Sequence, residues 1–391
     1  MTKTGRPEGT YTLWGGPLSL YTGKTRSYLI KKQIPYVERF PSHPDFPARV
    51  MPAIGMFVVP VLETPDGTFV QDTTRIFEYL EARHPEPSFV PASPLQNAVA
   101  WLISAFASEG LLQAAMHYRW SYRREQESFL QAEFARILNS RSGRAARDAQ
   151  AMTVMQQMNN YLPVLGVTAQ TAPAIEASYE ALLGILDQHF ASHPYLLGGR
   201  PSIADFGLMA PLFAHLSRDP YPSNLMKLTA PNVYRWTERM NLAQIADGEF
   251  PQQSDDYPPG DDIPETLVPL LQHIFADWGP EIVAYAGRYN AWIKANPSAP
   301  AGHLLSQSQE RRVHPSLGEV TFDLRGVPMR RQCAPQALWH FDKAASLARG
   351  LAAGPSRDRW QALMRRTGGA PVMAISLARP IAHSNNVLVL A

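Results

Sequence analysis

Cysteine is almost absent from this sequence. Its 391 residues include one cysteine, Cys333, so an intrachain disulfide is impossible and a metal site built from several thiolates is excluded. A chain of this length buries enough surface to fold without such cross-links. The lack of cysteine fits a reducing compartment, and we expect the protein to be cytoplasmic.

Excess charge of one sign and long apolar runs are lacking too. The 36 basic side chains (Lys and Arg) nearly balance the 34 acidic ones, so no strong field favours nucleic acid or an anionic membrane as a partner. No stretch approaches the roughly 18 apolar residues of a membrane span, and residues 1–9 lack the apolar core of a signal peptide. We therefore expect a soluble protein with a small-molecule partner, in which residues 1–9 form a loose tail.

Strand-like and helix-like segments alternate in the first ninety residues. Asp66 and Gly67 lie between two apolar runs, a pattern typical of a β-hairpin. Together the patterns predict one α/β domain, residues 10–90, with this order of segments: strand 11–14, helix 23–32, strand 35–40, a proline-rich connector, strand 57–62, strand 68–70 and helix 73–83.

Helical periodicity dominates the next part of the chain. It predicts an all-α domain over residues 95–250, with helices at 97–119, 125–138, 145–165, 175–189 and 203–216. Residues 251–264 contain four prolines and four aspartates, a composition typical of a linker. The remaining part is predicted to be a mixed α+β extension, residues 265–391, with helices at 266–295 and 335–351 and a hairpin at 319–331.

Four short motifs follow one another along the chain. They are Ser-Leu-Tyr-Thr-Gly-Lys-Thr-Arg (19–26), Val-Pro-Val-Leu (59–62), Asp-Gly followed by Asp-Thr-Thr-Arg-Ile-Phe-Glu-Tyr-Leu (66–80), and Tyr-Leu-Leu-Gly-Gly-Arg-Pro-Ser-Ile-Ala-Asp (195–205). The first three are similar to motifs of serine-type glutathione transferases, and the fourth is similar to a segment of their helical domain. The fourth also predicts a helix capping box between Ser202 and Asp205. The sequence thus resembles the glutathione transferase superfamily over about residues 10–245.

The resemblance implies both a fold and an activity. The fold is a thioredoxin-like α/β domain that binds glutathione, followed by an all-α helical bundle and, in this chain, by the mixed α+β extension. The activity is conjugation of the glutathione thiolate to an apolar electrophile in an interdomain cleft. Glutathione is the co-substrate, no metal is needed, and the resemblance implies a cytoplasmic homodimer that acts in detoxification.

The resemblance also assigns roles to single residues. Ser19 stands at the start of the first helix, where its hydroxyl can donate to the glutathione thiolate; the neighbouring hydroxyls of Tyr21 and Thr22 are alternatives. Val59, before a cis Pro60, is implied to bind the cysteinyl part of glutathione through its backbone. Asp72 and Thr73, at the start of the last helix of the domain, are implied to bind the γ-glutamyl ammonium and carboxylate. A purely structural role is open for each, because Ser and Thr are common helix caps.

A basic and aromatic run in the helical domain is a candidate substrate site. Tyr118, Arg119 and Trp120 are able to line a site for an anionic or aromatic group, or to belong to a solvated helix end.

Two departures from the family motifs favour a second function. Leu20 stands where the family has proline, and Asp72-Thr73 replaces its acidic-serine pair, so a non-catalytic binding or interaction protein, or a carrier of an apolar ligand, is the alternative to a transferase.

Overall fold

The computed structural model describes residues 9–138 and 143–391. The first eight residues of the predicted tail lie outside the described part. The N-terminal domain is built on one four-stranded sheet of order β2-β1-β3-β4, in which β1 runs parallel to β2 and antiparallel to β3. Its elements are β1 (Tyr11–Trp14), α1 (Leu20–Lys31), β2 (Tyr36–Arg39), β3 (Val61–Glu63), β4 (Phe69–Gln71) and α3 (Thr73–Arg83). The predicted thioredoxin-like order of strands and helices is confirmed.

The proline-rich connector of this domain differs from the prediction, because it is helical. It forms a π-helical turn, η1 (Phe46–Val50), which leads into the short helix α2 (Met51–Ile54). Pro47 and Pro52 lie in the first turns of these elements, where a missing N–H costs no hydrogen bond. Phe46 and Ile54 are buried with Trp14 in a small apolar cluster of their own.

The second domain is all-helical, as predicted. Its elements are α4 (Pro94–Ala105), η2 (Phe106–Gly110), α5 (Leu112–Trp120), α6 (Arg123–Leu138), α7 (Arg144–Asn159), η3 (Leu162–Leu165), α8 (Ala172–Phe190), α9 (Ile203–Pro211), η4 (Leu212–Ser217), α10 (Pro220–Thr229) and α11 (Pro231–Arg239). The last two are additional to the five predicted helices, and each begins with a proline. Asp205 accepts hydrogen bonds from the backbone N–H groups of Ser202 and Leu196 (2.8 and 2.9 Å), so the predicted capping carboxylate is in place.

Contrary to the expectation from the sequence, one continuous helical stretch of this domain, Pro94–Trp120, is long and apolar enough to cross a membrane by composition alone. However, 89% of its most apolar window is buried inside the protein. This stretch is therefore a central core helix of the fold.

The C-terminal extension contains more secondary structure than the sequence predicts. Its elements are η5 (Glu265–Leu267), α12 (Val268–His273), η6 (Ile274–Trp278), α13 (Gly279–Ala295), β5 (Glu319–Leu324), β6 (Val327–Gln332), α14 (Pro335–Arg349), α15 (Pro355–Thr367), α16 (Ala370–Met373), β7 (Ile381–Ser384) and β8 (Val387–Leu390). The predicted helices and the β5-β6 hairpin are present. The β7-β8 hairpin was missed although Asn385-Asn386, both at positive φ, form the type of turn that hairpins favour.

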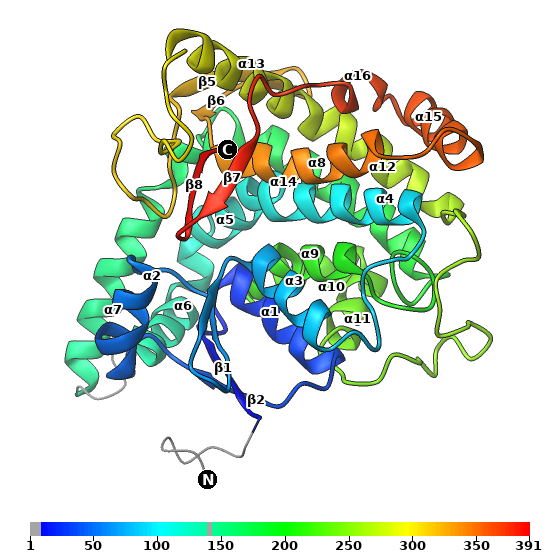
Figure 1. Ribbon diagram of the computed structural model, residues 1–391. Coiled ribbons are helices and arrows are strands. Elements are labelled where there is room, and N and C mark those ends of the chain that lie inside the picture. The colour runs from blue at the N-terminus through cyan, green and yellow to red at the C-terminus, as the bar shows by residue number, and fades with distance from the viewer. Residues whose placement is uncertain (1–8, 139–142) are drawn as a thin grey trace.

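The extension is packed onto the rest of the molecule. Figure 1 shows α14 running alongside α4, with the terminal hairpin β7-β8 near the N-terminal domain. Buried apolar side chains of all three parts, such as Leu13, Leu102 and Leu338, belong to one continuous core. The predicted linker, all of whose residues (251–264) the structure describes, forms no helix or strand, but the Gln96 side chain donates to the carbonyls of Pro258 and Asp262 (both 2.9 Å).

Candidate functional site

Three chain segments meet at one end of the N-terminal sheet. Trp14 of β1 is paired with Val61 of β3, and Val61 is paired with Gln71 of β4. Because neighbouring strands lie about 4.8 Å apart, the residues just beyond this row are close together. Those residues are the segment that leads into Ser19, the Val59-Pro60 segment and the start of α3.

The Val59–Pro60 peptide bond is cis, as the resemblance implies. Val59 is half-buried. Over residues 9–138 and 143–391, no group forms a hydrogen bond with the N–H or C=O of Val59. An unpaired peptide group just beyond the end of a strand is able to form hydrogen bonds with the backbone of a bound peptide.

The three candidate hydroxyls at the start of α1 have different environments. The Ser19 hydroxyl caps α1 by accepting from the Thr22 N–H (3.2 Å), and it is half-buried. Its own proton is donated to no other residue that the structure describes. The Tyr21 hydroxyl donates to the Ser108 carbonyl (3.0 Å), and burial raises the pKa of Tyr21 well above 10. Ser19 is therefore better placed than Tyr21 to donate to a ligand.

The Thr22 hydroxyl points into the protein. It is fully buried and lacks a hydrogen-bond partner among the described residues. A Cβ atom at Gly15 would lie only 2.3 Å from the Thr22 Oγ1 atom, so glycine is required there. This packing separates the Thr22 hydroxyl from any ligand in the cleft.

The start of α3 presents a free helix N-terminus. Asp72 caps the helix through Oδ1, which accepts from the Thr74 N–H (2.8 Å), and it does so with a φ of 73°. Such a left-handed backbone is costly for most residues but is more accessible to Asp. Within the described part of the chain, neither the Thr73 N–H nor its hydroxyl has a hydrogen-bond partner. A helix N-terminus with free N–H groups favours a carboxylate.

The structure adds residues that the sequence reasoning missed, and two of them come from the extension. The Gln336 amide of α14 donates to Asp72 Oδ2 (3.1 Å). His340, one turn further on, has Nδ1 3.4 Å from Thr74 Oγ1 and Nε2 3.6 Å from Glu109 Oε1. The residues at the start of α3 are thus bordered by α14 and by the turn η2.

The electrostatics of this cluster are dominated by burial. Burial raises the pKa of Glu109 to about 8, although the Arg331 guanidinium opposes the shift. Burial lowers the pKa of Lys24 to about 8 and that of His340 to about 4. Lys24 donates to the Ser108 hydroxyl (3.2 Å). A sequence signal for Glu109 exists, because it is the one charged residue between positions 94 and 118 of an apolar helix.

The predicted substrate residues lie in internal packing. Arg119 forms a bidentate ion pair with the buried Asp219 (2.6 and 2.8 Å) and also donates to the carbonyl of Leu18 (2.9 Å). Tyr118 and Trp120 are buried. Arg119 therefore supports the backbone just before Ser19. Tyr118, Arg119 and Trp120 are not part of the proposed ligand site.

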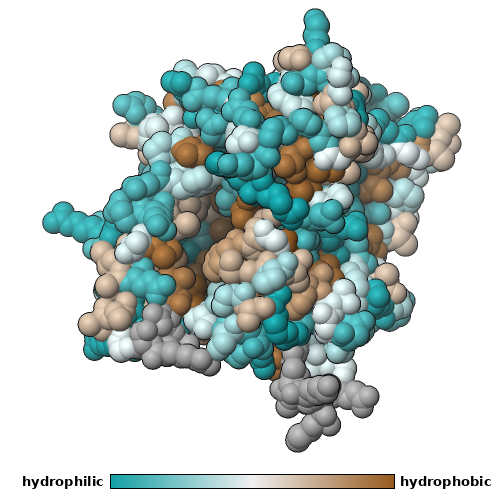
Figure 2. Space-filling view, turned by 60° about the vertical axis from the view of Figure 1, so that its left-hand side comes forward, coloured by the Kyte–Doolittle hydropathy of each residue, from teal (hydrophilic) through white to brown (hydrophobic). Residues whose placement is uncertain are grey.

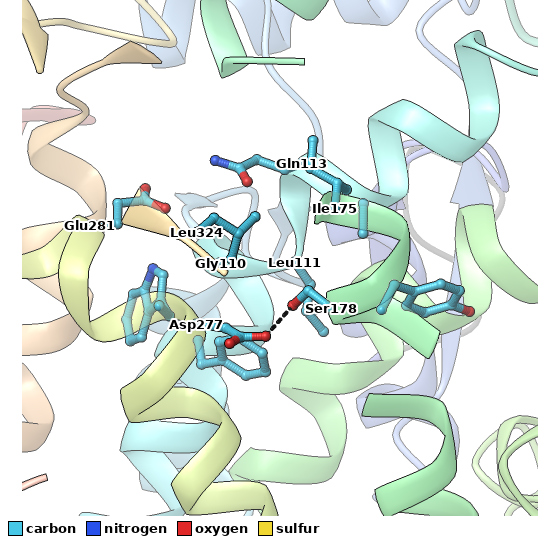
Figure 3. A pocket seen from close by; sticks show the side chains of 12 residues that line it. Gly110, Leu111, Gln113, Ile175, Ser178, Asp277, Glu281 and Leu324 are labelled. Carbon is cyan, nitrogen blue, oxygen red and sulfur yellow. Dashed lines mark hydrogen bonds between the residues drawn. The ribbon is translucent and has the colours of Figure 1, made fainter. Parts of the chain in front are cut away.

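A small cavity lies beside the site, between η2, α8 and η6. Figure 3 shows it lined by side chains that include Gln113, Asp277 and Glu281, and the Ser178 hydroxyl donates to Asp277 (2.6 Å). Its volume is about 30 Å³, which holds a few water molecules rather than a tripeptide. A hollow is visible on the face shown in Figure 2, with apolar side chains around it.

Metal binding finds no support in the described residues, where no group of three or more His, Cys, Asp or Glu side chains gathers to hold an ion. The groups described at this end of the sheet are hydrogen-bond donors and acceptors.

The chain joins a thioredoxin-like domain to a helical bundle, and the hydrogen-bonding groups of Ser19, Val59 and Thr73 lie at one end of the sheet. This combination of fold and site can be compared with known protein families. Two family models match the chain: the glutathione S-transferase N-terminal domain over residues 13–88, and the glutathione S-transferase C-terminal domain over residues 169–239. These two regions of the chain match the glutathione S-transferase superfamily. No curated protein sequence matches it.

Solved structures of the superfamily are similar to part of the chain. A glutathione S-transferase from Methylobacterium radiotolerans, in complex with glutathione sulfonate, has 19% identity and a TM-score of 0.36, covering 64% of this chain and 96% of its own. Glutathione transferase GSTFuA3 from Phanerochaete chrysosporium has 17% identity and a TM-score of 0.42, covering 62% and 100%. A glutathione S-transferase from Ceriporiopsis subvermispora, in complex with glutathione, has 19% identity and a TM-score of 0.39, covering 60% and 99%.

Proposed function

We propose that this protein is a glutathione transferase that conjugates the glutathione thiolate to an apolar electrophile. One observation carries the proposal: the free proton of the Ser19 hydroxyl, the unpaired peptide group of Val59 and the free N-terminus of α3 at Thr73 lie at the same end of one sheet. Each group has a counterpart in glutathione. The Ser19 hydroxyl is suited to the thiolate, the Val59 peptide group to the cysteinyl backbone, and the N-terminus of α3 at Thr73 to the γ-glutamyl carboxylate.

The chemistry requires an ionised thiol. A free thiol has a pKa of about 8.5 and is mostly protonated at neutral pH, whereas the thiolate is the nucleophile. Ser19 donates a hydrogen bond to the thiolate, and the positive end of α1 adds to its stabilisation. The thiol proton goes to solvent, the sulfur forms a bond to the electrophilic carbon, and the leaving group departs with the electron pair.

The proposal includes the cellular setting that the family resemblance implies: a cytoplasmic homodimer that acts in detoxification. One feature of this chain limits the form of such a dimer. The face of α4 is covered by α14 of the same chain (Figure 1), so a second subunit has to contact another surface.

A second function, binding without conjugation, is favoured by two departures from the family motifs: Leu20 stands where the family has proline, and Asp72-Thr73 replaces its acidic-serine pair. A protein of this kind binds a ligand and shows no turnover of thiol and electrophile.

Calorimetric titration with glutathione, together with turnover of an aryl halide, tests the proposal. Saturable binding and conjugation are expected. Replacing Ser19 with alanine removes a hydrogen bond to a charged group, so kcat/KM falls by about 10- to 100-fold. The matched control is Ser93→Ala, because Ser93 caps α4 by the same type of bond. That control loses about 1 kcal/mol of stability and keeps its turnover.

A wild-type protein that binds no glutathione contradicts the proposal. Binding without turnover favours the second function. Equal turnover in the wild type and in Ser19→Ala removes the role assigned to Ser19.

A further inference from the structure

The C-terminal extension is held firmly against the start of α3. Lys343 of α14 forms an ion pair with Glu78 of α3, and its ammonium lies 4.1 Å from the centre of the Trp101 ring of α4. These contacts fix α14 relative to both domains. The polar side chains at the beginning of α14, Gln336 and His340, are therefore fixed over the helix N-terminus at Thr73.

The γ-glutamyl end of glutathione carries both an ammonium and a carboxylate. The N-terminal domain alone does not offer enough hydrogen-bonding groups to bind both. Thr73 supplies donors for the carboxylate. For the ammonium, the domain supplies Asp72, one of whose oxygens already accepts from the Thr74 N–H. A bound ammonium has three N–H donors, and it costs free energy to leave them unpaired in a buried site.

The extension and η2 provide the missing acceptors. Gln336 holds Asp72 Oδ2 through its amide nitrogen, and its carbonyl oxygen has no partner among the residues that the structure describes. Glu109 is 6% exposed, and its Oε1 atom lies 3.6 Å from the Nε2 atom of His340. Gln336 contacts Asp72 directly, and Glu109 is connected to Asp72 through His340 and Gln336.

We propose that Gln336 and His340 of the extension, together with Glu109, complete the binding site for the γ-glutamyl end of glutathione. This inference rests on the proposed function. In the complex, the Gln336 carbonyl and the Asp72 and Glu109 carboxylates accept from the ligand ammonium, while Thr73 donates to its carboxylate. His340 orients Glu109 and Thr74 and is a positioning residue.

The test uses the full-length protein and two S-methylated ligands. One is S-methylglutathione, and the other is the analogue in which a glutaryl group replaces the γ-glutamyl group, so that only the α-ammonium is missing. Competition binding gives the ratio of their Kd values. In the wild type, the analogue is expected to bind at least about tenfold more weakly, since a hydrogen-bonded charge is lost.

The informative variants are Gln336→Met and His340→Phe, which keep the volume of each side chain. Each is expected to weaken S-methylglutathione by about fivefold to twentyfold and to affect the analogue by less than twofold, so the ratio of Kd values falls. Gln361→Met, in the exposed face of α15, is the matched control and leaves both affinities unchanged.

The possible outcomes separate this inference from the proposed function. If the wild type binds neither ligand, the proposed function fails. If the wild type binds S-methylglutathione but the variants keep the wild-type ratio, only this inference is overturned, because a purely structural effect weakens both ligands equally. Tighter binding by Gln336→Met also overturns it, because Gln336 then blocks the site.

Discussion

The two walls of the candidate site are built in different ways. The wall from the N-terminal domain consists of helix ends and a peptide group: the Ser19 cap, the Val59 backbone and the free turn at Thr73. The wall from the helical domain and the extension consists of side chains, Glu109 and His340 among them, whose burial shifts their pKa values in opposite directions.

This difference decides what each wall does. Helix ends and peptide groups are positioned by the sheet, so under the proposed function the first wall would bind what is common to any extended peptide. Buried ionisable side chains respond to the charge of a ligand, so under the same proposal the second wall would select the ligand. The comparison predicts that substitutions in the supports of the first wall change stability, whereas those in the second change affinity.

The largest expected effect is on stability. Arg119→Met removes the partner of Asp219, which is fully buried, and also the bond to the carbonyl of Leu18. Leaving such a carboxylate unpaired costs about 3–5 kcal/mol. Urea unfolding measures the loss, and Arg124→Ala, at an exposed position of the same basic run, is the control with a change within about 0.5 kcal/mol. A stable Arg119→Met protein with a raised KM for the electrophile would instead return Arg119 to the substrate site.

The first wall was also the more predictable one. Helix α3 has the predicted bounds, Thr73–Arg83, because its cap and apolar periodicity are local. The contact between Gln336 and Asp72 spans 264 positions, and no local pattern specifies it. Helix α15 was missed although Trp360, Leu363 and Met364 recur at helical spacing, because most of its other residues are polar and hid this pattern. The choice among Ser19, Tyr21 and Thr22 depends on burial, which adjacent residues in a sequence do not reveal.

The next largest expected effect is on the affinity for glutathione, and it concerns Asp72, where the two walls meet. Asp72→Asn keeps a helix cap that tolerates positive φ but removes the negative charge. We expect the Kd for glutathione to rise by about 10- to 100-fold, because a hydrogen bond between charged groups is worth about 1.5–3 kcal/mol. Calorimetry measures it. Asp66→Asn, in the exposed turn of the same domain, is the control, and an unchanged Kd in Asp72→Asn would remove Asp72 from the ligand site.

A smaller effect concerns pH and the second wall. In the free protein the pKa of Glu109 is about 8, so at pH 6 the carboxyl is protonated. A bound ammonium favours the ionised form and lowers this pKa, so binding releases a proton below pH 8. The affinity for S-methylglutathione therefore rises with pH by about tenfold between pH 6 and 8 and then levels off.

The variant Glu109→Gln identifies the group responsible. The charged and titratable groups around Glu109 include Lys24, Asp72, Glu281, Arg331, His340, Tyr21 and Tyr161. The pKa of Lys24 is also about 8, so the wild-type profile alone does not assign the titration. Glu109→Gln is expected to bind more weakly at pH 8 and to lose the rise with pH. An unchanged profile in this variant would exclude Glu109 from contact with the ammonium.

The smallest expected effect is a gain in stability, at Thr22 in the interior of the first wall. Thr22 buries a hydroxyl that has no partner in the described structure, and an unsatisfied buried polar group costs about 1–3 kcal/mol. Thr22→Val has the same shape and removes that cost, so it should stabilise the protein by about 1 kcal/mol and leave turnover unchanged. Urea unfolding and kcat/KM measured on the same preparation check both parts. If Thr22→Val loses turnover as Ser19→Ala is expected to do, the thiolate is bound by Thr22, and the first wall has to rearrange to expose it.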